Sequence, residues 1–328
     1  MRKALKVLGY LILSIILLVS IVLVYIKVAL PNIGPAPDLK IVVTPEKIER
    51  GRYLANSVTV CMDCHSTRDW TKFAGPLTEG TLGKGGERFD QQAGFPGVYY
   101  SKNITPAGIS RYTDGELFRL ITTGVTKEGR AMFPVMPYGH YGKMDPRDIE
   151  SIIAYIRSLS PIQNQVPDSK SDFPMNFIIN TIPKKAIPEE MPAPTDTIAY
   201  GKYMVNASAC IECHTPVDKG QIIEKLAFGG GREFSMPAGI IRSANITPDA
   251  ATGIGSWTKE MFLKRFKAYA DSSYQPALVK ESEFNSIMPW MMYSKMKPED
   301  LSAIYTYLRS VKAIDHKVVK FSGKIAAK

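Results

Sequence analysis

Two short motifs constrain this chain more than any other feature. Both have the form C-x-x-C-H: Cys61-Met-Asp-Cys64-His65 and Cys210-Ile-Glu-Cys213-His214. This pattern is the attachment site of a c-type haem. The two cysteine sulfurs become thioethers, the adjacent histidine binds the iron, and a helical turn places positions i, i+3 and i+4 on one face. The sequence therefore predicts two covalently bound haem c groups, with the histidine of each motif as an iron ligand.

Three other uses of four cysteines compete with haem attachment. A redox-active dithiol expects a thioredoxin-like setting and needs no histidine. A four-cysteine zinc site needs pairs that are close in sequence, whereas these pairs begin at residues 61 and 210. Structural disulfides are the third alternative. A histidine after both cysteine pairs favours haem, and therefore an electron-carrying protein, over all three.

The N-terminus carries a membrane signal. Arg2, Lys3 and Lys6 precede an uncharged stretch of 20 residues, 7–26, which is long enough to span a bilayer as a helix. No A-x-A-like cleavage site follows before Pro31, so we expect an uncleaved signal-anchor in residues 1–30 rather than a removed signal peptide. The preceding positive charges predict a cytoplasmic N-terminus. The haem-bearing remainder then lies on the periplasmic side of a bacterial inner membrane.

The charge balance says less about partners. The 328 residues contain 41 Lys+Arg and 31 Asp+Glu, for a net charge of +10. No nucleic-acid motif is present and the charge is scattered, which favours a solvated surface over a nucleic-acid site. The densest basic run is near the C-terminus: Lys312, Lys317, Lys320, Lys324 and Lys328. We expect redox proteins and the membrane, and no nucleic acid, as partners.

The rest of the chain is one pattern written twice. Five pairs of segments match in the same order: 51–54 with 201–204, 85–89 with 230–234, 103–106 with 245–248, 136–138 with 288–290, and 155–158 with 307–310. A repeat of about 150 residues indicates domain duplication rather than a solenoid. We predict a tether at 31–44, a first domain at 45–160, a Pro-rich linker at 161–195, a second domain at 196–314 and a basic tail at 315–328.

Apolar spacing predicts a mainly α fold. The expected helices are 45–56, 116–123 and one beginning at Pro146 in the first copy, and 196–207, 259–269 and one beginning at Pro298 in the second. No clear hairpin or alternating strand pattern appears. Inside the linker, Phe173, Met175 and residues 177–179 are too apolar for a free tether, so we expect this portion to pack across the domains.

The sixth iron ligand is sought by position in the repeat, because the chain has 14 methionines. Met136 and Met288 stand in matching Met-Pro-aromatic triplets just before the last helix of each copy. A loop there can hold a thioether against the haem iron, so we predict these two as axial ligands. The neighbouring alternatives are Met132, Met291 and Met292. Met144 and Met296 also match, but they directly precede a helix and are interpreted as structural.

Bis-histidine ligation is the competing arrangement. Only His140 and His316 remain for it, and they do not occupy matching positions, so we interpret both as exposed or propionate-side residues. We expect a backbone carbonyl to accept a hydrogen bond from the second ring nitrogen of His65. Pro76 is the candidate in the first copy.

Several longer segments resemble a known family. They are Asn245-Ile246-Thr247-Pro248-Asp249 with residues 252–258, Met136-Pro137-Tyr138 with Tyr141 and Met144, residues 154–159, and Phe173-Pro174-Met175-Asn176. Over about residues 45–314 the chain resembles the cytochrome c subunits of membrane-bound alcohol, gluconate and related sugar dehydrogenases. The resemblance implies two tandem type-I cytochrome c domains, with His65/Met136 and His214/Met288 as axial pairs. Those subunits usually carry three haem motifs, whereas this chain has two.

Two function classes follow. The first is a membrane-anchored dihaem electron carrier that accepts single electrons from a dehydrogenase or quinol-oxidising donor and passes them to a cytochrome or terminal oxidase. It needs no catalytic acid–base pair and is not itself an enzyme. The alternative is a dihaem enzyme, such as a peroxidase, in which one haem iron has an open sixth position. Matching methionine loops in both copies favour the carrier over the enzyme and over a purely structural subunit.

Overall fold

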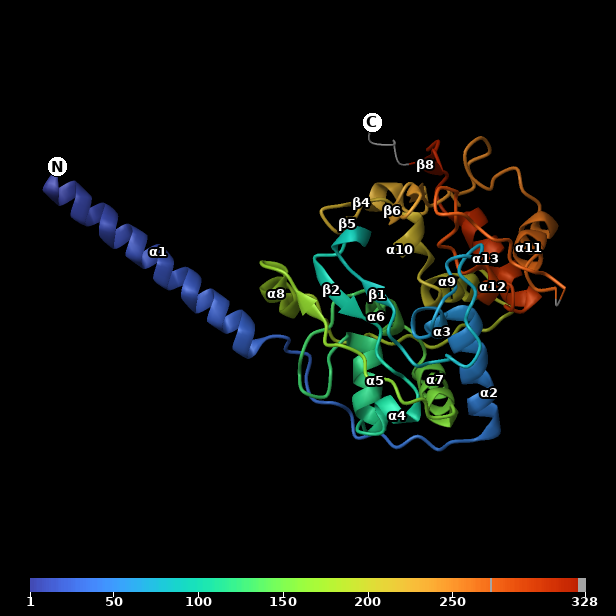
Figure 1. Ribbon diagram of the computed structural model, residues 1–328, viewed down its shortest axis with the longest axis horizontal. Helices are drawn as coiled ribbons and strands as arrows, with labels where there is room; N and C mark the ends of the chain where they lie inside the picture. The colour runs from blue at the N-terminus through green and yellow to red at the C-terminus, as the bar shows by residue number, and fades with distance from the viewer. Residues whose placement is uncertain (272, 324–328) are drawn as a thin grey trace.

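The computed structural model describes residues 1–271 and 273–323. A long N-terminal helix, α1 (Arg2–Ala29), projects from a body that contains both C-x-x-C-H motifs (Figure 1). All side chains of α1 are at least partly exposed, and the helix is long and apolar enough to cross a membrane. The remaining elements fall into an N-terminal half (residues 45–160) and a C-terminal half (residues 196–314).

The N-terminal half is mainly helical. Its elements are α2 (Pro45–Tyr53), a π-helical turn η1 (Leu54–Val58), α3 (Cys61–Cys64), β1 (Arg88–Phe89), η2 (Gln91–Ala93), β2 (Gly97–Tyr100), α4 (Pro106–Ile109), α5 (Asp114–Thr123), α6 (Tyr138–Tyr141) and α7 (Pro146–Ser158). The helix predicted over 45–56 thus changes to π geometry before the first haem motif. Local signals set its helix starts: Thr113 and Glu116 form a capping box on α5, and Asp145 caps α7 ahead of Pro146.

The C-terminal half repeats the main helices in the same order. Its elements are α9 (Thr197–Ala207), α10 (Cys210–His214), β4 (Val217–Asp218), β5 (Gln221–Ile222), η4 (Glu224–Leu226), β6 (Glu233–Met236), β7 (Gly239–Arg242), α11 (Lys259–Lys267), α12 (Trp290–Tyr293) and α13 (Pro298–Ser310). Between the halves lie β3 (Lys170–Ser171), α8 (Met175–Ile178) and η3 (Ile179–Thr181), and β8 (Phe321–Gly323) follows α13. The expected helix positions are confirmed to within two or three residues.

One tight crossing of two helices organises each half. Helix α2 packs on α7, and a Cβ atom at Gly51 would lie 1.8 Å from the carbonyl oxygen of Ser151. Helix α9 packs on α13, and a Cβ at Gly201 would lie 2.0 Å from the carbonyl oxygen of Ala303. Both glycines belong to the sequence repeat, so their match reflects the close approach of the first and last helices in each half.

Short antiparallel sheets lie beside the helices, contrary to the sequence analysis, which found no hairpin pattern. Strands β1, β2 and β3 form one sheet, β6, β7 and β8 form another, and β4 pairs with β5. Each of these strands has two to four residues, which is too short for a recognisable alternation. Gly97 and Gly239 occupy matching positions, where a Cβ would meet the third strand at the carbonyl oxygens of Lys170 and Ser322.

The third strand of each large sheet comes from a segment expected to lie outside a domain. Strand β3 belongs to the predicted linker and β8 to the predicted basic tail. In the linker, the carbonyl oxygen of Ile162 accepts a hydrogen bond from Asn103 at 2.7 Å, and in the tail that of Lys320 accepts one from the backbone N–H of Arg242 at 2.8 Å. Both segments therefore lie along the preceding half. Residues 324–328 of the basic tail lie outside the described residues.

The apolar part of the linker does not pack between the halves, so that expectation is wrong. Helix α8 and η3 lie beside α1 instead. Phe173 is 80% exposed and Ile178 is 43% exposed. Contacts within the body therefore leave these apolar side chains exposed, although the sequence predicted that they would be buried.

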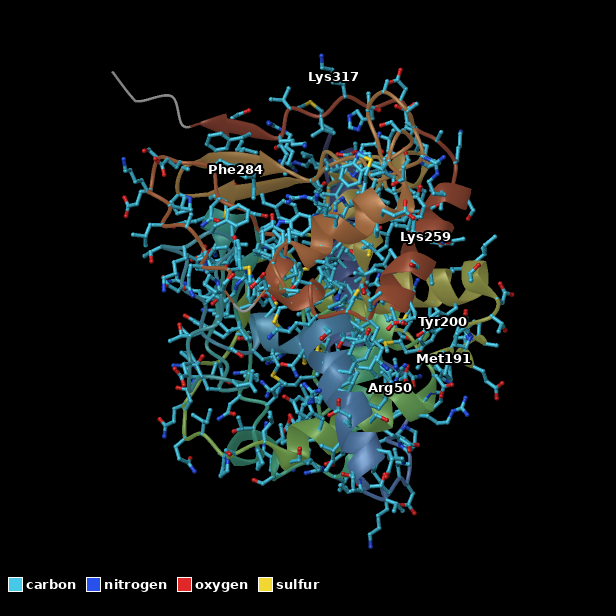
Figure 2. All side chains as sticks on the ribbon, turned by 90° about the vertical axis from the view of Figure 1, so that its right-hand side faces the viewer. Arg50, Met191, Tyr200, Lys259, Phe284 and Lys317 are labelled. Carbon is cyan, nitrogen blue, oxygen red and sulfur yellow. The ribbon has the colours of Figure 1, made fainter. Side chains whose placement is uncertain are left out.

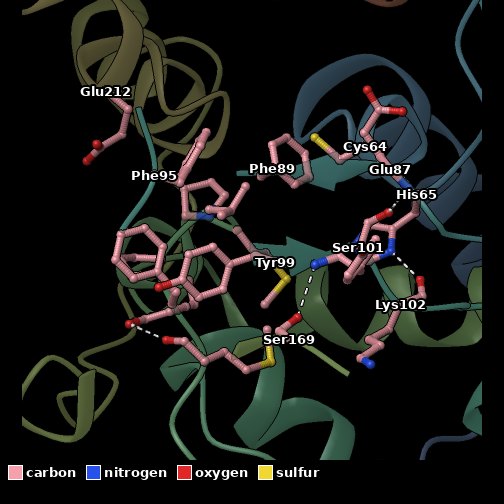
Figure 3. Close-up of a pocket in the computed structure, with 18 of the residues that line it drawn as sticks. Cys64, His65, Glu87, Phe89, Phe95, Tyr99, Ser101, Lys102, Ser169 and Glu212 are labelled. Atoms are coloured by element: carbon pink, nitrogen blue, oxygen red, sulfur yellow. Dashed lines mark hydrogen bonds between the residues drawn. The ribbon is translucent and has the colours of Figure 1, made fainter. Parts of the chain in front are cut away.

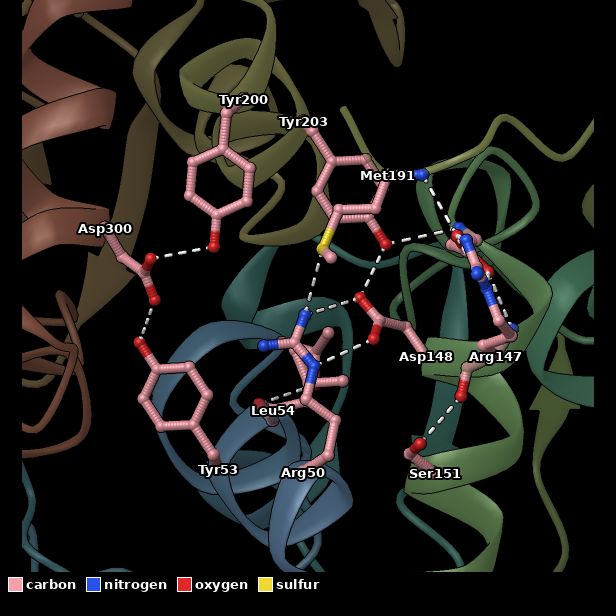
Figure 4. Close-up of polar contacts among 12 residues, drawn as sticks. Arg50, Tyr53, Leu54, Arg147, Asp148, Ser151, Met191, Tyr200, Tyr203 and Asp300 are labelled. Atoms are coloured by element: carbon pink, nitrogen blue, oxygen red, sulfur yellow. Dashed lines mark hydrogen bonds and ion pairs between the residues drawn. The ribbon is translucent and has the colours of Figure 1, made fainter. Parts of the chain in front are cut away.

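Two tyrosine–aspartate pairs join the halves with matching geometry (Figure 4). The Tyr53 hydroxyl of α2 donates to Asp300 of α13, and the Tyr203 hydroxyl of α9 donates to Asp148 of α7 at 2.7 Å. Each hydroxyl also accepts a backbone N–H, from Lys297 and Asp145 respectively. The exchange is reciprocal, so a pseudo-twofold relation connects the two halves.

Additional contacts close the same junction. Figure 2 shows Arg50, Met191 and Tyr200 near one another where the first helices of the two halves approach. The Arg50 guanidinium forms a bidentate pair with Asp148 and lies 3.3 Å from the Met191 sulfur. One continuous cluster of buried apolar side chains extends through both halves. The two haem motifs are thus held in a fixed mutual arrangement.

Candidate functional site

Both C-x-x-C-H motifs begin at the same unusual backbone conformation. Val60 and Ala209, which directly precede the first cysteine of each motif, have left-handed φ angles of 45° and 48°. This region is uncommon for any residue with a Cβ and particularly so for a β-branched valine. Strained conformations of this kind persist where the surroundings fix them and often mark functional sites. Here the left-handed residue ends the preceding turn and starts a new helix at Cys61 or Cys210.

The two motif histidines are oriented by backbone carbonyls. Nδ1 of His65 lies 2.6 Å from the carbonyl oxygen of Lys102, and Nδ1 of His214 lies 2.8 Å from that of Ala244. A carbonyl can only accept, so each Nδ1 carries the proton and each Nε2 keeps a free lone pair for a metal. The expectation of a backbone acceptor is confirmed. Pro76 is the wrong residue, because its carbonyl accepts from the backbone N–H of Asp69.

The matching Asn-Ile-Thr-Pro loops explain why these carbonyls are available. In both loops the asparagine side-chain oxygen accepts from the threonine N–H at 2.9 Å and from its hydroxyl at 2.7 Å: Asn103 with Thr105, and Asn245 with Thr247. These two hydrogen bonds fix the turn just after Lys102 in the first loop and just after Ala244 in the second. Sequence reasoning recognised the loops as repeat markers and missed their role in holding the motif histidines.

A glycine completes the frame around each histidine. The backbone N–H groups of Gly85 and Gly230 donate to the carbonyls of His65 and His214, both at 2.8 Å. A Cβ at Gly85 would lie 2.5 Å from the carbonyl carbon of Lys102, and one at Gly230 would meet Ala244 at 2.4 Å. Both glycines also have φ near +72°, which favours glycine. The Gly-Gly segments of the repeat are therefore required by the approach of this backbone to the histidine-holding loop.

One large cavity of about 2980 Å³ lies against the first motif and extends to the second. It is lined by Cys61, Cys64, His65 and Met136. In the C-terminal half the cavity is lined by Cys213 of the second motif and by Ile287 and Pro289, which flank Met288. Figure 3 shows Cys64 and His65 on one side of this cavity and Glu212, from the C-terminal half, on another. The structure thus brings the predicted ligands of the first half to a single hollow.

The thiols are not suited to dithiol chemistry. All four cysteines are free, and burial raises the pKa of each, to about 12 for Cys64 and Cys210. A reactive redox thiol has a lowered pKa instead. Within residues 1–271 and 273–323, three or more His, Cys, Asp or Glu side chains nowhere gather into a metal-binding group. The apolar surroundings fit a group that is held by its own covalent bonds.

The methionine loops have the same shape in both halves. Met136 and Met288 are half-buried, their carbonyls accept the N–H of Tyr138 and Trp290 at 2.8 Å, and the intervening prolines have φ of −78° in both. Met144 and Met296 are fully buried, as expected for structural residues. Among the alternatives, Met132 lines the large cavity, Met292 is buried in the core, and Met291 lines a separate small pocket.

The two remaining histidines are both held by protein groups. Nδ1 of His140 lies 2.9 Å from Oδ1 of Asn206, and its Nε2 lies 2.9 Å from Oε1 of Glu212. Both ring nitrogens of His140 are therefore engaged across the junction of the halves. His316 bonds to the carbonyl of Gly229 through Nδ1 at 2.9 Å. Sequence analysis gave His140 no partner, because Glu212 is 72 residues away.

The residues present fit a covalently attached haem. Each motif supplies two free thiols and one imidazole whose Nε2 is free while its Nδ1–H is held by a carbonyl. The first set also faces a cavity together with a thioether side chain. Imidazole and thioether are established axial ligands of haem iron. The residues of each motif could therefore attach a haem and bind its iron.

Comparisons with known proteins agree with this chemistry. Residues 198–312 match the family model for cytochrome c, which implies covalently bound haem c. The gluconate 2-dehydrogenase cytochrome c subunit of Pantoea cypripedii is 26% identical over 286 residues, which cover 82% of this chain and 60% of that protein. The cytochrome c subunit of a quinone alcohol dehydrogenase from Gluconobacter oxydans is 25% identical over 285 residues, 81% and 55% of the two chains.

A dihaem c-type cytochrome of Cereibacter sphaeroides is 27% identical over 268 residues, which cover 78% of this chain and 83% of that protein. The chain spans 55–60% of the length of the two dehydrogenase subunits. The predicted resemblance is confirmed. The protein is mainly helical, contains a cytochrome c domain, and is homologous to the cytochrome c subunits of gluconate and alcohol dehydrogenases and to a dihaem c-type cytochrome.

Proposed function

We propose that this protein is a membrane-anchored dihaem cytochrome c that transfers single electrons in the periplasm. The observation that carries the proposal is the matched setting of the two C-x-x-C-H motifs. Each has a left-handed residue before it, two free thiols within it, and a histidine fixed by the carbonyl that precedes an Asn-Ile-Thr-Pro loop. The family model matches the second copy, and the first copy has the same frame.

In this proposal, residues 45–160 and 196–314 are two tandem cytochrome c domains. Cys61, Cys64, Cys210 and Cys213 would attach two haems, which would supply one-electron redox chemistry. Nε2 of His65 and Met136 would hold one iron, and Nε2 of His214 and Met288 would hold the other. A thioether ligand would keep the potential higher than a second imidazole would. With each iron held by two side chains, the protein would carry electrons without substrate chemistry.

The homologous dehydrogenase subunits suggest the donor side. We propose that electrons enter from a dehydrogenase or a quinol-oxidising complex and leave to another cytochrome or a terminal oxidase. Helix α1 would anchor the protein in the inner membrane. Because Arg2, Lys3 and Lys6 precede the apolar stretch, the haem domains would lie on the periplasmic side.

The haem content can be tested directly. Pyridine haemochrome spectra of the full chain should show two haems c per polypeptide. The double variant Cys61→Ala/Cys64→Ala should retain one haem, and Cys210→Ala/Cys213→Ala should retain the other. Haem that acid acetone extracts, or loss of both haems from either double variant, would contradict two independent covalent sites.

The axial ligands separate the carrier from a dihaem enzyme. Met136→Ala and Met288→Ala should each open one iron to carbon monoxide in the reduced protein. Met132→Ala lines the same cavity without matching in the repeat, so it is the control and should leave both irons six-coordinate. If the reduced wild-type protein binds carbon monoxide readily at one haem, the symmetric carrier is wrong and a peroxidase-like enzyme is favoured.

A further inference from the structure

An exposed apolar segment lies where α1 meets the body. This segment, residues 173–187, contains α8 and η3, and both contact the C-terminal part of α1 (Figure 1). Nζ of Lys27 donates to the carbonyl oxygen of Asn176 at 2.6 Å and lies 4.8 Å from the centre of the Phe177 ring. The segment is thus fixed to one level along the axis of α1.

That level corresponds to the edge of a bilayer. The uncharged stretch before Lys27 has 20 residues, which span about 30 Å at 1.5 Å per residue, the thickness of the hydrocarbon layer. If α1 crosses the membrane, Lys27 lies at the boundary between acyl chains and headgroups. Phe177, held against Lys27, then lies at the same depth.

The side chains of segment 173–187 suit such a boundary. Phe173, Ile178 and Ile187 are 80%, 43% and 74% exposed, although each would be expected to avoid water. Aromatic residues concentrate at the interface between membrane and water. The segment also contains Lys184 and Lys185, both exposed, and no acidic residue. Lysines at this depth attract anionic headgroups.

The segment and the end of α1 border one cavity. Lys184, Lys185, Met175 and Ile179 line it, as do residues 27–31, at the C-terminal end of α1 and just after it. A charged, apolar and aromatic surface next to an anchor helix fits a lipid surface better than bulk water. We propose that residues 173–187 dock on the headgroup layer of an anionic bilayer and form a second membrane contact.

The consequence is a fixed orientation of the haem-bearing body. Anchoring by α1 alone would allow the body to tilt relative to the membrane. A second contact, through residues 173–187 at the level of the headgroups, would hold the body against the membrane. The cavity that contains His65 and Met136 is also lined by residues 27–31. Docking would therefore fix the position of this cavity relative to the membrane. This inference rests on the proposed anchor role of α1.

Site-directed spin labelling can test the docking in full-length holoprotein reconstituted into vesicles. The four native cysteines are consumed by haem, so one added cysteine is labelled uniquely. We would compare Phe173→Cys with Met261→Cys, which is 51% exposed on α11 at the far side of the body from α1 (Figure 1). Ile16→Cys, in the middle of α1, tests the anchor itself. Accessibility to oxygen and to a water-soluble nickel chelate gives the depth of each label, with the haems reduced.

In vesicles containing anionic lipid, the label at position 173 should favour oxygen over nickel severalfold more than the label at 261. The substitutions Lys184→Glu and Lys185→Glu together should shift the 173 label toward water. If the label at 16 is buried in lipid but the label at 173 is as water-accessible as that at 261, the docking proposal is overturned while the anchor stands. If the label at 16 is itself in water, the anchor proposal fails and docking fails with it.

Discussion

The crossing of α2 and α7 at Gly51 allows a quantitative test of how each half is held together. Gly51→Ala adds one methyl group at a point where the Cβ would lie 1.8 Å from the carbonyl oxygen of Ser151, 2.4 Å from its carbonyl carbon and 2.8 Å from Cβ of Tyr155. Ordinary contacts at these atoms are about 3.4 Å or more. The two helices must therefore move apart, because two of the obstructing atoms belong to the backbone.

The expected cost exceeds the gain from helix propensity. Alanine in place of glycine inside a helix is favourable by about 1 kcal/mol. Overpacking in a close-packed core costs about 1–3 kcal/mol, and more where backbone must shift. Because the backbone must shift and Leu54 and Ile153, both fully buried, belong to the same core, we take the upper end of the cost, about 3 kcal/mol, and a net loss of about 2 kcal/mol. This corresponds to a fall in Tm of about 4–8 °C for a unit of 150 residues or more.

Thermal unfolding of the full chain in detergent, followed by far-UV circular dichroism, would measure this change. Gly139→Ala is the matched control, since it lies on the short helix α6 and a Cβ there has open space around it. It should leave Tm unchanged within about 2 °C. The equivalent Gly201→Ala, whose Cβ would lie 2.0 Å from the Ala303 carbonyl oxygen, should behave like Gly51→Ala. A Gly51→Ala protein as stable as the control would refute the crossing.

Three further changes test the junction, the pH response and the haem environment. Tyr203→Phe removes the donor to buried Asp148 and should cost about 1.5–3 kcal/mol in denaturant unfolding, because it leaves a charged group short of a partner. A hydrogen bond from Arg147 lowers the pKa of Asp145 from 3.8 to about 2. Between about pH 2 and pH 4 the unfolded state therefore binds more protons than the folded state does. The resulting stabilisation of about 1–2 kcal/mol is present above pH 4 and lost toward pH 2, and acid titration of Asp145→Asn should lack it. His140→Ala leaves the Glu212 carboxylate without its imidazole partner, so redox titration should show one haem potential lowered and the other unchanged; equal shifts in both would contradict a local effect.

The sequence was most informative where side-chain chemistry is local. The C-x-x-C-H spacing needs only a helical turn, and α3 and α10 supply one in each half. The last helices begin at Pro146 and Pro298, as proline at a first helical turn predicts. These features depend on a few adjacent residues, so no knowledge of distant contacts was required.

The carbonyl that holds His65 could not be found in this way. Lys102 is 37 residues from His65 and acts through its backbone oxygen, for which any residue type would serve. The available signal was indirect: Lys102 and Ala244 both directly precede an Asn-Ile-Thr-Pro loop of the repeat. Proximity in sequence suggested Pro76 instead, whereas the short strands and glycine turns bring the later loop to the histidine.

The apolar linker shows a different limit. Phe173 and its neighbours predicted burial because hydrophobic side chains avoid water, but that argument cannot identify the apolar phase. Within the protein the segment contacts α1, and Phe173, Ile178 and Ile187 remain exposed. If these side chains contact a bilayer, the composition correctly predicted that they avoid water, and only the expected contact between the two halves was wrong.

The repeat is symmetric in backbone and asymmetric in charge at the place where the halves meet. Helix α6 packs on α9, and α12 packs on η1, so each methionine loop closes over the first helical region of the other half. At matching positions after the Met-Pro pair stand His140 and Met292. His140 reaches Glu212 inside the second motif, whereas Met292 is buried and shares a small pocket with Asp63 of the first.

This asymmetry gives the two motifs different electrostatic settings. Glu212 is paired with His140 and Arg232 at a partly exposed edge, while Asp63 is buried beside Arg68 at 2.8 Å, and burial raises its pKa to about 6. A charge near a haem shifts its reduction potential, and burial strengthens the effect. The two motifs therefore share one backbone frame and differ in their charged neighbours. If each motif holds a haem, as proposed, the two reduction potentials would be unequal and would favour one direction of electron flow between them.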